Sequence, residues 1–337
     1  MRRLAVRGGK RKGGAEVFNA LIVCYLFLGG AGAGSLVVLC VFELANACKA
    51  SCAVESRRKL LPLGSPERRS VVPQELFARS WPICFVVLSA GMLCLAFDLG
   101  RFDRALSIFL TPQPSAMAIG AYGLVVALVC AGLFAVRALF NAPAVPRAAT
   151  CIFGVAGIVA GIIVAAYTGV LLQSMASVLF WMNPLLPVLF CLSSLSTGIA
   201  LVFLGLAFTD SRTPADHAVR WLARADVAVI VLELACLAAY MLVASGSSGA
   251  KRSLEALVSG ELMWYFWIGV IACGLIVPAL LDWFASWRNY RSQVLWVAAL
   301  VLVGGLLLRI CIVGAGAYDV TQDAHALYGF TAGSLGL

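Results

Sequence analysis

Eight long apolar runs alternate with shorter polar segments along the 337 residues of the chain. Each run has about the 20 residues that a helix needs to cross a hydrocarbon layer roughly 30 Å thick. None shows the two-residue alternation of a barrel strand, so each run must satisfy its backbone groups as a helix. We predict spans at Val17–Leu44, Trp81–Leu99, Ser115–Phe140, Cys151–Leu172, Pro184–Phe208, Val227–Ala244, Met263–Phe284 and Val294–Val313.

These spans predict an all-α fold, a polytopic membrane helical bundle. Leu26-Phe27 followed by Gly34 in the first span is weakly echoed by Leu189-Phe190 followed by Gly198 in the fifth. Such an echo indicates two four-helix halves. We divide the chain into a basic N-terminal tail (1–16), a transmembrane domain (17–313) with a basic loop (45–80), and a C-terminal tail (314–337).

Composition excludes a water-soluble fold, since 62% of the residues are hydrophobic, 12% are charged and the mean hydropathy is +0.97. The net charge of +9 comes largely from Lys and Arg beside the spans, so it bears on membrane topology and not on nucleic acid. The odd-numbered connections carry more of these cations, which places both termini outside. The six basic residues of the N-terminal tail favour the opposite orientation.

The other connections are short, and we expect them to dock against protein. They are Gly100–Pro114, Gln173–Asn183 and Ser245–Leu262. We expect no cleavable signal peptide, because the first apolar run is too long for one. The pair Arg2-Arg3 fits a basic flank better than a twin-arginine signal.

Two residue counts limit the cofactors. Intramembrane haem b needs axial histidines on facing helices, and the two histidines, His217 and His325, lie outside the predicted spans. Most of the 12 cysteines lie inside apolar runs, and Cys48 with Cys52 alone is a weak metal signal. We therefore expect no haem, no iron–sulfur cluster and no metal site in this chain.

Six segments, in their order along the chain, resemble the NrfD/polysulfide reductase family of membrane anchor subunits. An aromatic entry leads into glycine and alanine in the first, the second has the order Asp-Leu-Gly-Arg, and the fourth begins with Tyr-Thr-Gly. The segments are 25–34, 97–101, 111–120, 167–172, 181–198 and 309–314.

The resemblance implies an anchor that holds no cofactor of its own and exchanges electrons with menaquinone or ubiquinone. Its implied partner is a four-cluster ferredoxin-like iron–sulfur subunit. That subunit would serve a molybdopterin catalytic subunit of the dimethyl-sulfoxide or polysulfide reductase type. The implied location is the bacterial cytoplasmic membrane.

Polar side chains inside hydrocarbon are costly and are therefore candidates for function. We expect Tyr167 to donate a hydrogen bond to one quinone carbonyl and Asn19 or Tyr25 to hold the other. The resemblance supports the role of Tyr167. Some family members have a histidine in the first helix, where this sequence has none, so Asn19 or Tyr25 would take its place. Tyr167 alternatively serves as an interfacial aromatic residue, Asp98 with Arg101 as a structural ion pair, and Arg309 as a partner of Asp98. The predicted quinone-binding residues are Asn19, Tyr25, Asp98, Arg101, Tyr167 and Arg309.

Three carboxylates form a second set of candidates. Glu43 and Asp282 lie near the inner ends of their predicted spans, and Glu233 lies within the sixth. They fit either a polar rim at the inner face or a proton path toward the quinone site.

Two other functions compete with the redox anchor. A secondary transporter of a small solute would be expected to have a helix broken near mid-membrane, whereas Pro184 and Pro187 lie at a predicted helix start. A purely structural tether would leave the polar residues near one membrane surface without a role.

Overall fold

The computed structural model describes residues 12–59, 74–98, 116–140, 146–175, 178–208, 216–247, 249–285 and 290–334. Over these ranges the chain is helical, and 8 helices are long and apolar enough to cross a membrane, which confirms the predicted all-α membrane bundle. The helices are α1 (Lys12–Lys59), α2 (Gln74–Asp98), α4 (Ala116–Leu139), α5 (Arg147–Gln173), α6 (Leu185–Ala207), α7 (Asp216–Gly246), α8 (Lys251–Val258), η1 (Tyr265–Ile276), α9 (Val277–Ala285) and α10 (Tyr290–Ser334). The π-helix η1 continues directly into α9, and the two together form the seventh span.

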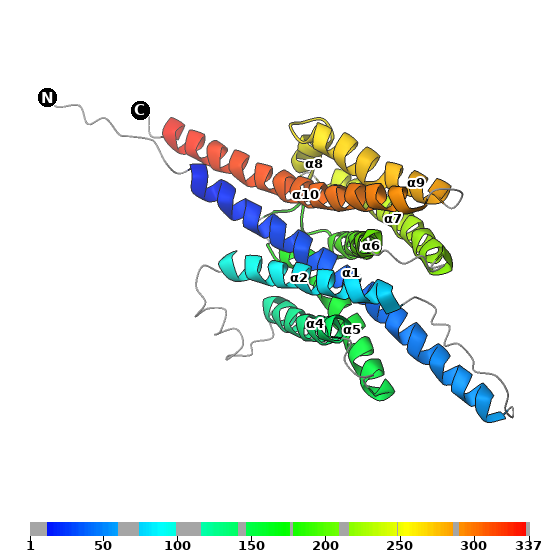
Figure 1. The fold of residues 1–337 in the computed structure, drawn as a ribbon. Coiled ribbons are helices and arrows are strands. Elements are labelled where there is room, and N and C mark those ends of the chain that lie inside the picture. Colours follow the sequence, from blue (N-terminus) through cyan, green and yellow to red (C-terminus); the bar gives the residue numbers. More distant parts are fainter. Residues whose placement is uncertain are drawn as a thin grey trace.

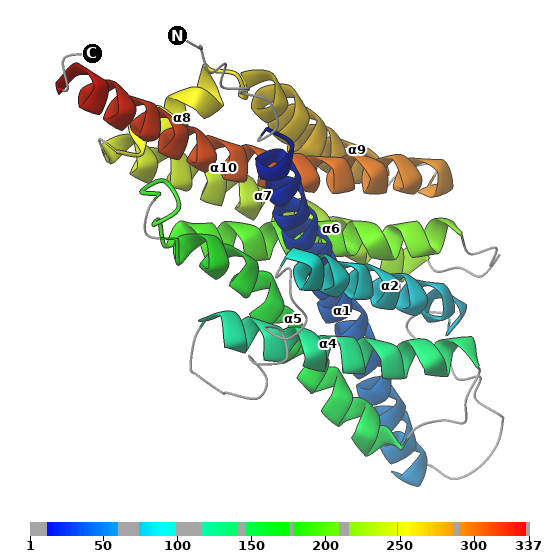
Figure 2. The ribbon, with the colours of Figure 1, turned by 90° about the vertical axis from the view of Figure 1, so that its left-hand side faces the viewer.

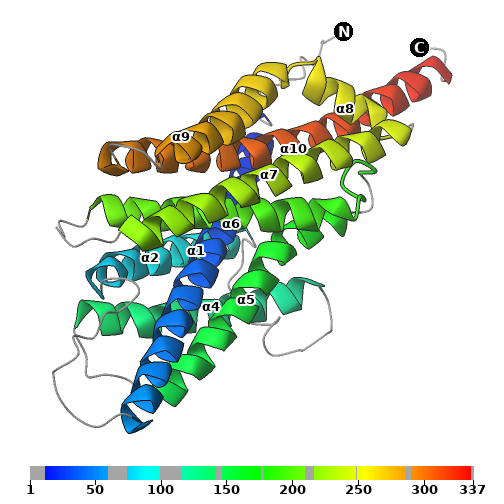
Figure 3. The same ribbon diagram turned by 90° about the vertical axis from the view of Figure 1, so that its right-hand side faces the viewer.

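The helices fall into two groups of four spans (Figures 1 and 2). Helices α1, α2, α4 and α5 pack together, as do α6, α7, the η1–α9 span and α10. The two groups meet chiefly where α1 contacts α6, and Figure 3 shows α6 lying between α1 and α7. This arrangement matches the predicted four-helix halves, with the first and fifth spans in equivalent central positions.

The contact between α1 and α6 depends on glycine. A Cβ atom built at Gly34 would overlap the carbonyl oxygen of Ser194, and one built at Gly198 would overlap the backbone of Gly34. A Cβ at Gly30 would lie 2.5 Å from the Ser194 hydroxyl and 2.8 Å from the guanidinium of Arg309. The glycines of the two echoed segments therefore bring the two backbones into direct contact.

Several helices are longer than predicted. Helix α1 begins at Lys12, inside the predicted tail, and ends at Lys59, inside the predicted basic loop. Its extension is rich in Ala, Arg and Lys, which are strong helix formers, so the apolar pattern underestimated its length. Helix α10 likewise continues to Ser334 through the predicted C-terminal tail, a stretch without proline.

The bundle has two ends that serve as landmarks. At the first, called here the Tyr167 end, α5 finishes against the start of α4 and Gly316 of α10 packs on Trp181. At the second, the Asp282 end, Gly205 of α6 packs on Ser80 of α2, and the ring of Phe42 lies 6.1 Å from that of Trp221. Since helices of about 20 residues separate them, these ends correspond to the two surfaces of a membrane.

Candidate functional site

Two tyrosines from different helices of the first half lie close together near the Tyr167 end. Tyr25 of α1 is 2% exposed and Tyr167 of α5 is 5% exposed. The two hydroxyl groups lie within hydrogen-bonding range of each other. Neither hydroxyl, however, has a hydrogen-bond partner with good geometry among the residues that the structure describes. Buried phenols almost always have a partner, so this pair has unused capacity to donate hydrogen bonds.

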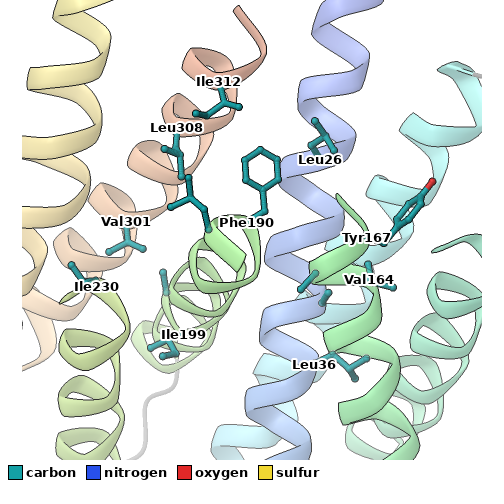
Figure 4. Packing of buried hydrophobic residues seen from close by; sticks show 14 of the residues in the cluster. Leu26, Leu36, Val164, Tyr167, Phe190, Ile199, Ile230, Val301, Leu308 and Ile312 are labelled. Carbon is teal, nitrogen blue, oxygen red and sulfur yellow. The ribbon is translucent and has the colours of Figure 1, made fainter. Parts of the chain in front are cut away.

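The ring of Tyr167 is held by the helix opposite it. Figure 4 shows Tyr167 projecting from α5, with its hydroxyl directed away from Phe190 and Ile199. A Cβ atom built at Gly120 of α4 would overlap the Tyr167 ring. Glycine at position 120 therefore leaves the space that the ring occupies.

Gly120→Ala should displace the Tyr167 ring while leaving the bundle assembled, because the added methyl overlaps a side chain and not a backbone. If Tyr167 acts at the site, activity that depends on this hydroxyl falls several-fold. Gly29→Ala is the matched control, since its Cβ would lie 3.5 Å from the Tyr25 ring, an ordinary contact distance. Equal activity of the two variants would show that the position of the Tyr167 ring does not matter.

Arg309 of α10 is fully buried and connects three helices. Its Nε donates to the carbonyl oxygen of Leu26 in α1 at 3.0 Å. One terminal nitrogen donates to the Ser193 hydroxyl at 3.2 Å and to the Gly305 carbonyl at 2.9 Å, and the other donates to the Ser194 hydroxyl at 3.1 Å. The planar guanidinium suits this use, because its donors point in fixed and different directions.

Aromatic rings cover the same guanidinium. Its central carbon lies 5.8 Å from the centre of the Phe27 ring and 5.3 Å from that of Phe190. In Figure 4 the Phe190 ring lies between α10 and α1. Cation–π attraction of this kind is worth about 2 kcal/mol when the site is desolvated. The bonded carbonyl of Leu26 adjoins Tyr25 in sequence, so Arg309 fixes the segment of α1 that carries this tyrosine.

A group of buried carboxylates lies in the second half, between α7 and α9. Glu233 and Asp282, both predicted from the sequence, are joined by Asp226 of α7, which is fully buried. The hydroxyl of Ser196 in α6 donates to Asp226 Oδ1 at 2.9 Å. Asp226 was missed because the predicted span began at Val227; an aspartate beside an apolar run was the signal. Among the described residues, no group of three or more His, Cys, Asp or Glu side chains is placed to hold a metal ion.

Glu43 is not part of this group. It lies half-buried near Arg137 of α4 and Trp81 of α2, at the same end of the bundle but in the first half. The predicted set of three carboxylates is therefore divided, with Glu233 and Asp282 in one half and Glu43 in the other.

The remaining predicted residues fall at or beyond the limits of the described chain. Asn19 is in α1 and Asp98 is the last residue of α2, but their side chains lie outside the described part, and Arg101 lies wholly outside it. The structure therefore brings together Tyr25 and Tyr167, with Arg309 bonded to the residue that follows Tyr25.

Residues 178–184, which precede α6, are fixed at the Tyr167 end by side chains for which the sequence predicted no role. The Tyr240 hydroxyl donates to the Phe180 carbonyl at 2.7 Å, and the Trp181 indole N–H donates to the Ile312 carbonyl at 2.9 Å. Asn183 accepts a hydrogen bond from the backbone N–H of Leu185 at 3.0 Å, which caps the start of α6. Residues 178–184 therefore form a structured segment at the Tyr167 end.

Fold and site together define a multi-pass helical membrane protein with polar side chains buried within its two four-helix halves and, at Arg309, between them. Residues 10–321 match the model of the family described as polysulphide reductase, NrfD. The match extends over most of the sequence, so this protein belongs to this family of membrane subunits.

Three curated relatives share part of the sequence. The protein NrfD of Escherichia coli is 36% identical over 168 residues, which are 48% of this protein and 52% of the relative. The C subunit of the polysulfide reductase of Wolinella succinogenes is 36% identical over 159 residues, 45% of this protein and 50% of the relative. The NrfD homolog of Haemophilus influenzae is 30% identical over 161 residues, 47% of this protein and 50% of the relative. The protein thus spans about half the length of the relatives it matches.

Proposed function

We propose that this protein is the quinone-reactive anchor subunit of a respiratory redox complex in the bacterial cytoplasmic membrane. In this function it passes electrons between menaquinone or ubiquinone in the bilayer and a four-cluster ferredoxin-like iron–sulfur subunit. That subunit in turn serves a molybdopterin catalytic subunit of the dimethyl-sulfoxide or polysulfide reductase type. Family membership supports a subunit of a larger redox complex, since one relative is named as one of the chains of a polysulfide reductase.

The buried tyrosine pair is the observation that carries the quinone assignment. A quinone headgroup presents carbonyl oxygens that need donors, in a pocket otherwise apolar enough to admit its isoprenoid tail. Tyr25 and Tyr167 offer two hydroxyls that lie near each other and make no hydrogen bond of good geometry in the described structure. Both lie in the half of the bundle that is lined by apolar side chains, among them Leu26, Leu124 and Val164.

Arg309 and the structured segment at the Tyr167 end have supporting roles in this proposal. Arg309 holds the backbone beside Tyr25, so it is a positioning residue for the quinone site. The fixed segment of residues 178–184 offers a firm surface on which the iron–sulfur subunit would dock, within reach of the quinone headgroup. Asn19, Asp98 and Arg101 stay in the proposal as further polar groups of the site.

Tyr167→Phe tests the assignment most directly. The change keeps the packing of the ring on Gly120 and removes one hydrogen bond to the quinone, worth about 0.5–1.5 kcal/mol. Quinol-linked electron transfer by the intact complex should therefore fall several-fold, with unchanged assembly, as measured by quinol oxidation with a dye acceptor. Tyr25→Phe should behave in the same way.

Tyr122→Phe is the matched control, because it removes a hydroxyl from a half-exposed tyrosine of α4. It should keep normal turnover. Normal quinol-dependent turnover in Tyr167→Phe as well would contradict the quinone role. Purification of the protein without any iron–sulfur partner, together with solute uptake by vesicles that contain it, would favour the secondary transporter instead.

A further inference from the structure

Two of the buried carboxylates lie against each other in the interior of the bundle. Asp226 of α7 is fully buried and Asp282 of α9 is 6% exposed. The two side chains interact directly. The Oδ2 atom of each has no hydrogen-bond partner within the described ranges. Two negative charges in such a contact, away from water, repel each other strongly, so the arrangement is stable only when the pair shares a proton.

Polar side chains continue from this pair toward the middle of the bundle. Asp226 accepts the hydrogen bond from Ser196, one turn of α6 away from Ser193. Ser193 in turn lies within hydrogen-bonding range of Glu233, which is 7 residues after Asp226 and so faces the same side of α7. Ser193 also accepts a hydrogen bond from Arg309. The row of polar side chains therefore runs from the Asp282 end of the bundle to Arg309, which holds α1 beside Tyr25.

A small cavity lies beside the serines and Glu233 of this row of polar side chains. It has a volume of about 10 Å³ and is lined by Ser193, Ser196, Thr197 and Glu233 together with apolar residues of η1 and α10. This is about the space that one water molecule needs, and the polar lining offers such a water hydrogen-bond partners. Gly274 of the π-helix also lines the cavity, and its backbone packs against Gly304 of α10. Irregular helices of this kind often occur at functional sites.

We propose that Asp226, Asp282 and Glu233, connected by Ser196, Ser193 and a water-sized cavity, form a proton path from the Asp282 end of the bundle to the Arg309 region. The Asp226–Asp282 pair exchanges protons with the surface at the Asp282 end, and Glu233 relays them between this pair and the Arg309 region. Among the described residues, Arg309 and Cys236 are the further charged or titratable side chains that interact with Glu233, and Arg309 marks the inner limit of the path. Glu43 lies near Arg137 and Trp81 in the first half and is not a member of the path.

This inference rests on the proposed function, because the quinone site is what the path would serve at its inner limit. Oxidation of a quinol releases two electrons and two protons, and reduction of a quinone takes up the same number. The electrons pass to or from the iron–sulfur subunit, whereas the protons need a route to water. The path provides that route toward the surface opposite the quinone site, so electron transfer would move charge across the membrane.

The test uses the intact complex in sealed vesicles with a pH-sensitive dye, with quinol turnover measured in parallel. Asp226→Asn and Asp282→Asn should each lower the number of protons moved per quinol several-fold. Ser196→Ala should do so too, since it removes the hydroxyl that joins α6 to the pair while altering the packing very little. Glu255→Gln, a change at an exposed carboxylate of α8, is the control and should move protons as the unaltered complex does.

An infrared measurement tests the shared proton without any turnover. The unaltered protein should show the carbonyl stretch of a protonated carboxylic acid at neutral pH, and both Asp226→Asn and Asp282→Asn should weaken that band. Unchanged proton movement in all three path variants would overturn the inference and leave the quinone site intact. A dependence of turnover on sodium ions in place of protons would also overturn it. An unaltered complex that transfers no electrons from quinol would instead remove the proposed function.

Discussion

Gly34→Ala is expected to destabilise the protein more than the same substitution at any other glycine that the structure describes. A Cβ atom at this position would overlap the carbonyl oxygen of Ser194 and the neighbouring backbone of α6. Neither backbone can rotate away, so α1 and α6 must separate. Overpacking typically costs about 1–3 kcal/mol, and a clash with backbone belongs at the upper end of this range. The loss should appear as a lower thermal unfolding temperature in detergent and a lower yield of folded protein.

Gly314→Ala is the control for this prediction. Its Cβ atom would lie 3.4 Å from the flexible Leu262 side chain, which is an ordinary contact. Its unfolding temperature should therefore match that of the unaltered protein. Equal unfolding temperatures for Gly34→Ala and Gly314→Ala would show that the backbones of α1 and α6 are not in direct contact.

The eight spans were predictable because length and hydropathy determine which segments can cross a bilayer. The equivalence of the first and fifth spans also followed from sequence, through the Leu-Phe and glycine positions that the two share, whereas their central position in the bundle did not. The ends of the helices were less predictable. Outside the apolar run, α1 continues on the helix propensity of Ala, Arg and Lys, which leaves no pattern of hydrophobicity to detect.

The chemistry of the interior was predicted only in part. Tyr167, Glu233 and Asp282 stood out as polar residues in or beside apolar runs. The partners of Arg309 did not, because serines within a membrane helix usually bond to their own backbone and so carry little information. The hydrogen bond to the carbonyl oxygen of Leu26 could not be predicted, because every residue has such a backbone oxygen. Asp226 was not predicted because it lies one residue before the predicted start of its span, although the structure buries it completely.

Arg309→Met should strongly destabilise the protein, because the arginine joins α10 to α1 and α6 through three hydrogen bonds and makes a fourth to Gly305 within α10. Its removal leaves the hydroxyls of Ser193 and Ser194 and the Leu26 carbonyl without their donor. It also leaves Glu233 without its nearby cation. Breaking a buried network of charges by removing one partner typically costs about 3–5 kcal/mol. Thermal unfolding of the purified protein should show the loss.

Two further variants separate the geometry of Arg309 from its charge. Arg309→Lys keeps the charge, but an ammonium group cannot reach acceptors on three helices at once, so it should recover only a small part of the stability. Adding Glu233→Gln to Arg309→Met removes the uncompensated carboxylate, and the double variant should be more stable than Arg309→Met alone. If Arg309→Lys were as stable as the unaltered protein, the directed hydrogen bonds of the guanidinium would contribute nothing. Additive effects of Arg309→Met and Glu233→Gln would show that the two residues do not interact.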